Sequence, residues 1–207
     1  MSDTEKPLVL IIDDDEALRR SMAFLISTIG LECRGFENAE HFLREMPQPG
    51  RSGCILMDVR MPGMSGLELL RILRERGSVL PVLMITGHGD VPMAVAALKA
   101  GAADFIEKPF NDQHLLDAIT LAVRTSSQHL SASADRDCII QRAATLSGRE
   151  REVLWLVMAG KPNKVIAFEL GLSIKTVELH RHSLMEKMQV GSVAELARQV
   201  TLAGLHS

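Results

Sequence analysis

The chain has 207 residues, of which 46% are hydrophobic and 24% charged, with a formal net charge of −3; this composition excludes a disordered chain and fits one or two globular domains. No apolar run approaches the roughly 18 residues of a membrane-spanning helix, and the N-terminal sequence is not a secretory signal, so we expect a cytoplasmic protein. Three widely spaced cysteines without a CxxC pair argue against a disulfide framework and a zinc site.

Five short runs predict β-strands in the first half of the chain. Three of them are apolar throughout, which is typical of strands buried on both faces of a parallel sheet. The other two are weaker. The five runs are LVLII (8–12), ECRGF (32–36), GCILM (53–57), PVLMI (81–85) and DFIE (104–107).

Amphipathic segments lie between these runs and after the last one. Apolar residues recur at helical spacing over 18–29, 67–73, 95–98 and 115–123, and three of these segments are followed by a glycine. Because strand and helix alternate, the sequence predicts an α/β doubly wound five-stranded parallel sheet.

The character of the sequence changes after Arg124. Residues 125–142 are rich in Ser and Ala and lack a sustained apolar stripe, so we expect a linker there that is helical in part. The residues beyond it contain no strand-like run. The chain is therefore expected to consist of an α/β domain over 1–124, this linker, and an all-α domain over 143–207.

Capping boxes and glycines subdivide the all-α part. Ser147 with Glu150, and Ser192 with Glu195, each follow the pattern that opens a helix. Glycines then divide the segment into about four short helices. The middle pair of these helices is joined by a turn that contains Gly171.

The two halves of the chain differ in charge. Residues 1–125 carry 18 acidic and 13 basic side chains, whereas residues 126–207 carry 8 acidic and 10 basic ones. The mildly basic C-terminal half is a weak indication of a polyanionic partner.

Acidic residues follow the predicted strands. Asp13 and Asp14 come after the first strand, Asp58 after the third, and Lys108 after the fifth. In a doubly wound sheet, ligands bind beyond the carboxyl ends of the strands. Clustered carboxylates repel one another unless a cation is present, and hard oxygen ligands suit Mg²⁺. With a lysine beside them, the sequence predicts a site for Mg²⁺ and a phosphoryl group.

These motifs resemble the receiver domains of two-component response regulators. The resemblance covers VLIIDDDEALRRS, LMDVRMPGMSGLELL and VLMITGHGDVPMAVAALKAGAADFIEKPF, and the all-α part resembles the LuxR-type helix-turn-helix. The phrases DVRMPGMSG, TGHGDVPMAV and DFIEKPF are specifically similar to the FixJ subfamily. The resemblance implies a flavodoxin-like receiver followed by a DNA-binding domain. It also implies a cytoplasmic transcription regulator that a sensor histidine kinase phosphorylates.

The resemblance assigns roles to the residues at the strand ends. Asp58 is implied to be the phosphoacceptor, which forms an acyl phosphate and loses it only by slow self-dephosphorylation, so the protein is not an enzyme in the ordinary sense. Asp13 and Asp14, with Asp58 and the backbone carbonyl of Arg60, are implied to hold Mg²⁺. Lys108 is implied to contact the phosphoryl oxygens.

Further roles follow from the same resemblance. Thr86 is implied to turn its hydroxyl onto the phosphoryl group and to let Phe105 rotate inward, so that the two form a switch. Arg60 and His88 occupy positions that tune the lifetime of the acyl phosphate, although plain solvent exposure explains them equally well. The peptide bond before Pro109 is expected to be cis.

The helix-turn-helix suggests how the chain reads DNA. Its second helix, residues 173–188, is expected to enter the major groove and to keep Val177, Leu184 and Met188 inward. The expected base contacts are Glu178, Leu179 and His182; the expected phosphate contacts are Lys164, Lys175, Thr176, Arg181 and Lys187. A solvated helix face is the alternative explanation for these charges.

A dimer on double-stranded promoter DNA is expected because one modestly basic domain binds weakly. By resemblance, the fourth helix, fifth strand and fifth helix form a phosphorylation-dependent dimer face that includes Val91, Lys99 and residues near Ala118. Residues 193–204 are expected to pair the DNA-binding domains. RNA polymerase is the expected partner in activating transcription.

Two other functions fit parts of the sequence. A phosphohydrolase of the haloacid dehalogenase type also uses a strand-end aspartate and Mg²⁺, and Asp13 with Asp15 fits its motif, but Ala17 stands where Thr or Val is needed. That alternative also gives the helix-turn-helix no role. The other alternative is a DNA-binding regulator whose receiver dimerises without phosphate, and the intact acidic site argues against it.

Overall fold

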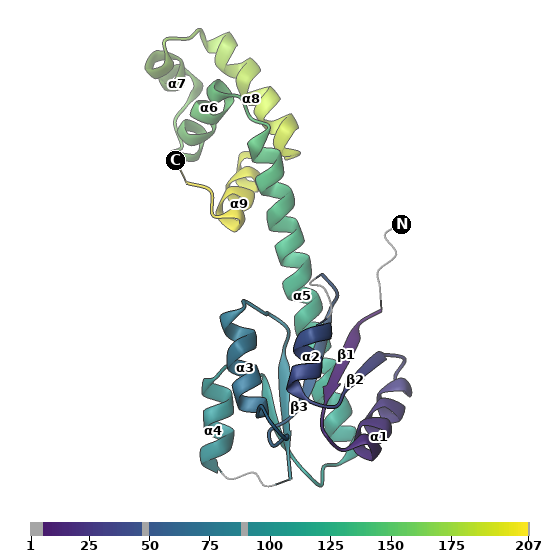
Figure 1. Cartoon of the computed structure of the whole chain (residues 1–207). Coiled ribbons are helices and arrows are strands. Elements are labelled where there is room, and N and C mark those ends of the chain that lie inside the picture. Colours follow the sequence, from purple (N-terminus) through teal and green to yellow (C-terminus); the bar gives the residue numbers. More distant parts are fainter. Residues whose placement is uncertain (1–5, 47–49, 88–90, 207) are drawn as a thin grey trace. The chain divides into compact units, whose positions relative to one another are not determined.

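The computed structural model describes residues 6–46, 50–87 and 91–206 (Figure 1). The chain divides into two compact units, one up to Leu130 and the other from Ser131 onward. Helix α5 (Asp112–Ala144) contributes its first part to the first unit and its last part to the second. Within the described residues, no helix combines the length and the apolar character that a membrane span requires.

The first unit is a five-stranded parallel sheet with strand order β2-β1-β3-β4-β5, which confirms the predicted doubly wound fold. The strands lie within one residue of the predicted runs. The elements before α5 are β1 (Leu8–Ile12), α1 (Glu16–Ser27), β2 (Glu32–Phe36), α2 (Ala39–Glu45), β3 (Gly53–Asp58), α3 (Gly66–Glu75), β4 (Val82–Thr86), α4 (Val91–Lys99) and β5 (Asp104–Glu107).

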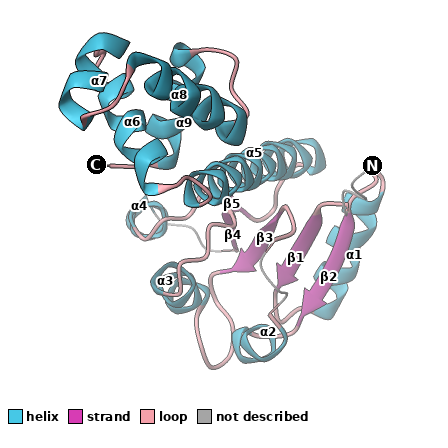
Figure 2. Cartoon of the chain, turned by 90° about the horizontal axis from the view of Figure 1, so that it is seen from above, coloured by secondary structure: helices cyan, strands magenta, loops and turns pink. Residues whose placement is uncertain are grey.

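Helices cover both faces of this sheet (Figure 2). Side chains alternate along each strand, so that Val9 and Ile11 pack with α1 and α5, while Leu10 and Ile12 pack with α2 and α3. Strands β1 and β3 are adjacent, and β2 lies on the far side of β1, so the strand order reverses at β1. The carboxyl ends of β1 and β3 therefore flank the switch point at which such sheets bind ligands.

The second unit is helical throughout, apart from its turns. It consists of the last part of α5 with α6 (Gly148–Met158), α7 (Asn163–Leu170), α8 (Ile174–Met188) and α9 (Val193–Ala203). Its apolar core includes Val153, Ile166, Val177 and Leu196. The turn between α7 and α8 contains Gly171, which ends α7 in the left-handed conformation at φ 65°.

Residues 125–142, expected to be a linker, all lie within α5. The division between the two units falls inside this segment, at Leu130 and Ser131. Ile139, near its end, is buried in the core of the second unit. Its Ser, Ala, Asp and Arg side chains are mostly exposed, which agrees with the lack of an apolar stripe in the sequence. The segment is nevertheless helical, because alanine and arginine favour a helix even without burial.

A buried carboxylate joins α6 to α8. Glu150, only 4% exposed, accepts hydrogen bonds from the Ser183 hydroxyl at 2.6 Å, the Lys187 ammonium at 2.7 Å and the backbone N–H of Ser147 at 2.7 Å. Burial alone raises the pKa of Glu150, but these hydrogen bonds outweigh that effect and lower the pKa to about 2. The glutamate of the predicted capping box thus also connects α6 to α8 through its side chain.

Helices α3 and α6 begin with the same local pattern in different surroundings. Each has a serine N-cap, a glycine at the first helical position and a glutamate that completes the capping box. A β-carbon at Gly66 would lie 2.1 Å from the backbone oxygen of Asp58, whereas one at Gly148 would meet nothing within 4 Å. Of these two glycines, Gly66 is therefore the one that a close backbone approach requires.

We expect Gly66→Ala to destabilise the first unit by about 1–3 kcal/mol, because the new methyl group overlaps the end of β3. Gly148→Ala places the same methyl group in open space and should stabilise its unit by about 0.5 kcal/mol. Urea unfolding of the full chain, followed by circular dichroism, measures both changes. Equal effects of the two substitutions would contradict the contact at Asp58.

The Glu150 network predicts a pH dependence. Because the pKa of Glu150 is about 2 when folded, against 4.5 ordinarily, the carboxylate stabilises the unit fully above about pH 5 and loses this effect as the pH falls toward 2. Glu150→Gln should therefore remove part of the acid sensitivity of unfolding, measured by the fluorescence of the single tryptophan, Trp155.

Glu152→Gln, on the exposed side of the same helix, is the matched control. Among the described residues its carboxylate is paired with the exposed Arg149, so its loss should hardly change the urea midpoint at neutral pH. An acid-unfolding curve that is the same for Glu150→Gln and the wild-type protein would disprove the role of the buried network.

Candidate phosphoacceptor site and DNA-binding surface

Asp13 and Asp14 follow β1 directly and differ in surroundings. Asp13 is 1% exposed, and its Oδ1 accepts a hydrogen bond from the backbone N–H of Asp15 at 2.9 Å. Asp14 is exposed. Asp15 caps α1 by accepting from the backbone N–H of Leu18 at 3.1 Å, and the first turn of α1 contains Glu16. The acidic run thus divides into two residues at the strand end and two at the helix start.

Lys108 connects the ends of β1 and β3. Its Nζ lies 2.8 Å from Oδ2 of Asp13 and 3.4 Å from Oδ2 of Asp58. The three residues are far apart in sequence, and the parallel sheet brings them together at one edge. The Lys108 side chain is 22% exposed and the Asp58 side chain 11%, so the group is recessed but open to solvent.

The Asp58 carboxylate is in an unfavourable environment for its charge. Burial has the largest effect and raises the pKa of Asp58. The Lys108 ammonium lowers this pKa, as does the backbone of Arg60, and the neighbouring Asp13 raises it. The net result is a raised pKa. Its Oδ1 is buried and accepts no hydrogen bond from the described residues. A buried carboxylate oxygen in that state is normally satisfied by a cation, a ligand or a water molecule.

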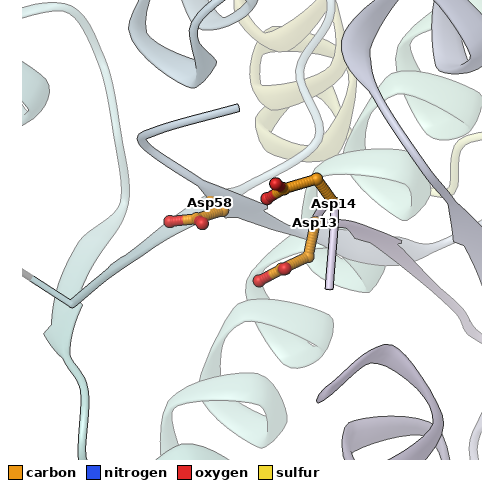
Figure 3. Close-up of side chains that lie close together, drawn as sticks. All are labelled: Asp13, Asp14 and Asp58. Atoms are coloured by element: carbon orange, nitrogen blue, oxygen red, sulfur yellow. The ribbon is translucent and has the colours of Figure 1, made fainter. Parts of the chain in front are cut away.

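The carboxylates of Asp13, Asp14 and Asp58 form a cluster that suits a divalent ion (Figure 3). One oxygen from each lies within 4.8 Å of the others. The donor set is entirely oxygen, which is what Mg²⁺ prefers, and the separation fits an ion that binds some of these groups through water. The unpartnered Oδ1 of Asp58 adds a ligand atom that the fold leaves unsatisfied. The residues present therefore fit Mg²⁺.

The loop after β3 carries Arg60, whose side chain is exposed. The loop closes where the backbone N–H of Gly66 donates to the carbonyl of Val59 at 3.0 Å, beside the close approach of Gly66 to Asp58. This closure positions the backbone of the loop next to the cluster. His88, the other residue expected to tune the acyl phosphate, lies outside the described residues.

Thr86 and Phe105 belong to neighbouring strands. Thr86 ends β4 and is fully buried, while Phe105 in β5 pairs with Met84 and is half-buried against the core. The carbonyl of Thr86 accepts from the backbone N–H of Lys108 at 2.7 Å. The predicted cis bond between Lys108 and Pro109 is confirmed. Thr86 and Lys108 are thus joined directly at this edge of the sheet.

The helix-turn-helix presents most of the predicted DNA contacts to solvent. Helix α8 begins after the N-cap Ser173 and buries Val177, Leu184 and Met188, as predicted. Leu179 is 63% exposed although it is apolar. The other exposed residues among the predicted contacts are Lys164, Lys175, Glu178 and His182.

Three of the predicted phosphate contacts have partners within the second unit. Lys187 binds the buried Glu150, and its Nζ also lies 3.5 Å from the carbonyl of Thr145. Arg181 donates to Oδ1 of Asn163 at 2.7 Å, which joins α8 to α7. Thr176 shares a hydrogen bond with the Ser173 cap. These bonds favour a structural role for Lys187, whereas the remaining residues stay candidates for DNA contacts.

Two residues make contacts at these sites that the sequence does not predict. Arg19 of α1 donates from Nη1 to the backbone carbonyl of Asp13 at 2.7 Å. The sequence predicts Glu150 only as part of a capping box, although it also binds Ser183 and Lys187. The partners lie in different elements, so a local motif does not reveal them.

Comparison with known proteins agrees with both sites. Residues 9–120 match the response regulator receiver domain, and residues 144–200 match the LuxR family of bacterial regulatory proteins. The chain is 46% identical to the transcriptional regulatory protein FixJ of Azorhizobium caulinodans, covering 95% of this chain and 93% of that one. It is 47% identical to FixJ of Rhizobium meliloti, covering 95% and 96%.

A solved structure supports the same assignment. The response regulator StyR is 42% identical and superposes with a TM-score of 0.86, covering 95% of this chain and 98% of that one. The two FixJ relatives are transcriptional regulatory proteins. The chain therefore belongs to the two-component response regulators that combine a receiver domain with a LuxR-type DNA-binding domain, and it acts as a DNA-binding regulator of transcription.

Proposed function

We propose that Asp58 accepts a phosphoryl group from the phosphohistidine of a sensor kinase in a Mg²⁺-dependent reaction, and that this modification promotes dimerisation and promoter binding. The observation that supports it most is the Lys108 ammonium between Asp13 and Asp58, with the Oδ1 of Asp58 buried and unpartnered by the described residues. Because the protein regulates transcription by binding DNA, it is proposed to act in the cytoplasm, where the chromosome lies.

The chain's own residues perform the transfer. A carboxylate oxygen of Asp58 attacks the phosphorus, the bond to the histidine nitrogen breaks, and an acyl phosphate forms. Burial makes this carboxylate more basic than a solvated one, as its raised pKa indicates. Lys108 already lies 3.4 Å from Asp58 and is placed to bind the phosphoryl oxygens. Asp13 and Asp14, with Asp58 and the carbonyl of Arg60, would hold Mg²⁺, which neutralises phosphoryl charge.

Phosphorylation changes the charge balance of the site. The phosphoryl group carries roughly −1.5 to −2 charges where the Asp58 carboxylate carried −1, so the cluster bound by Lys108 becomes more negative. Thr86 is buried at the end of β4, and its carbonyl accepts a hydrogen bond from the backbone N–H of Lys108. Its hydroxyl is proposed to turn onto the phosphoryl group. Phe105, half-buried on the next strand, is proposed to rotate inward when Thr86 moves. Hydrolysis of the acyl phosphate by slow self-dephosphorylation, tuned by Arg60 and His88, would reverse the change.

Helix α4 is the proposed dimer face. Only Ala97 of this helix is buried, while Val91 is 78%, Val95 42% and Leu98 50% exposed. The sequence spacing of Val95 and Leu98 therefore marks an outward apolar face rather than a core one. These exposed apolar side chains form a strip along a helix that buries few of its residues, and Lys99 lies at the end of the helix. Such a strip can be covered by the same surface of a second copy of the chain.

The DNA-binding unit is proposed to place the N-terminal part of α8 in the major groove. Lys164 and Lys175 would contact phosphates and Glu178, Leu179 and His182 would contact bases, because all five are exposed. Arg181 and Thr176 are weaker candidates for phosphate contacts, because each already has a hydrogen bond to another side chain of the same unit. Helix α9 would pair two such units on a promoter, and RNA polymerase is the proposed partner in activation.

Asp58→Asn is expected to abolish phosphate-dependent dimerisation, because the amide cannot form the acyl phosphate. Gel filtration of the full chain with Mg²⁺ and acetyl phosphate measures this: the wild-type protein should shift to a dimer and the variant should not. Asp137→Asn removes the same charge from an exposed position on α5 and should behave like the wild type. Dimerisation of Asp58→Asn on acetyl phosphate would refute the proposal.

Lys175→Ala is expected to weaken binding to all DNA sequences alike and to lower the slope of log K against log salt by roughly one unit. Fluorescence anisotropy with a specific and a random duplex at several salt concentrations measures the slope. Lys187→Met serves as the contrast: since Lys187 binds Glu150, it should lower stability and leave the slope unchanged. A change in preference at a single base pair would argue against a phosphate contact for Lys175.

A further inference from the structure

The three clustered carboxylates are held to different degrees. Asp13 is fixed by the backbone N–H of Asp15 and by Lys108, and Asp58 is fixed by Lys108. Asp14 is exposed, and among the described residues its carboxylate has neither a hydrogen bond nor an ion pair. The position of the Asp14 side chain is therefore set by its backbone, and above all by the peptide that joins it to Asp13.

Arg19 holds that peptide. Its Nη1 donates to the backbone oxygen of Asp13 at 2.7 Å, a charge-assisted hydrogen bond. Arg19 itself is anchored at the start of α1, where its backbone N–H donates to the carbonyl of Asp15 at 3.0 Å. Its Cδ and Nε pass beside Gly35 of β2, 3.7 and 3.8 Å from where a β-carbon would stand, so the stem of the side chain lies along the neighbouring strand.

We propose that Arg19 is a positioning residue for the divalent-ion site. By binding the carbonyl of Asp13, it fixes the peptide from which Asp14 extends and so places the Asp14 carboxylate beside those of Asp13 and Asp58. The inference rests on the proposed Mg²⁺ site at these three residues. Groups that orient metal ligands without touching the ion commonly change metal affinity by one or two orders of magnitude.

Charge and position make opposite predictions for this residue. The Arg19 guanidinium is a positive charge close to a cation site, so removal of its charge alone would strengthen Mg²⁺ binding. Loss of the hydrogen bond to Asp13 would weaken it, because Asp14 would no longer be held. The sign of the change therefore distinguishes a positioning role from a purely electrostatic one.

The test is a Mg²⁺ titration of the full chain by isothermal calorimetry, with Arg19→Met, Arg19→Lys and Arg20→Met. In the part of the chain that the structure describes, the ion pair of Arg20 is with the exposed Glu16, so Arg20→Met removes the same charge from the same helix and should bind Mg²⁺ as the wild type does. Arg19→Met should bind about tenfold more weakly. Arg19→Lys keeps the charge but loses the reach of the guanidinium, and should also bind more weakly.

A second readout separates positioning from damage to the fold. The rate of phosphorylation by acetyl phosphate should return to nearly the wild-type value for Arg19→Met at saturating Mg²⁺, while the half-saturating Mg²⁺ concentration rises. Should Arg19→Met unfold at a clearly lower urea concentration, Arg19→Lys decides the question by the same two measurements.

The outcomes for this inference and for the Mg²⁺ site are distinguishable. If the wild-type chain binds Mg²⁺ and Asp14→Asn weakens that binding, the ion site is supported; unchanged or tighter binding by Arg19→Met and Arg19→Lys then overturns the role of Arg19 alone. If the wild-type chain does not bind Mg²⁺, both the ion site and the role of Arg19 are overturned.

Discussion

The bond from Lys108 to Asp13 and Asp58 is the interaction on which the site depends. Two carboxylates at the ends of adjacent strands repel each other, and their burial increases the cost of that repulsion. Lys108, 95 residues from Asp13 along the chain, reaches both at 2.8 and 3.4 Å because β5 ends at the same edge of the parallel sheet. The fold and the proposed chemistry therefore require the same residues.

This arrangement explains how one added group can affect distant surfaces. One lysine, Lys108, lies between the Asp13 and Asp58 carboxylates. The proposed phosphoryl group and divalent ion on Asp58 would therefore change the electrostatic environment of Lys108, whose backbone N–H is bonded to Thr86. Thr86 and Phe105 lie on β4 and β5, next to the thinly packed α4, whose apolar residues face solvent. The helix proposed as the dimer face thus contributes a single buried residue, Ala97, to the core.

Sequence patterns were sufficient for the features that depend on local periodicity or on strand ends. All five strands were found because buried parallel strands are uniformly apolar or bounded by turn residues, and Asp13, Asp58 and Lys108 followed from their places after strands. Such patterns do not predict contacts between elements that are distant in the sequence. Arg19 meets a backbone oxygen, which leaves no mark in the composition, and Lys187 resembled a DNA contact because its partner Glu150 lies 37 residues earlier.

The position of the acyl phosphate tests the central claim most directly. Borohydride reduces a phosphorylated aspartate to homoserine, which mass spectrometry of peptides locates in the sequence. After incubation with acetyl phosphate and Mg²⁺, homoserine is predicted in place of Asp58 and of no other aspartate. Homoserine in place of Asp13 or Asp14, or none at all while the protein dimerises in response to acetyl phosphate, would contradict it.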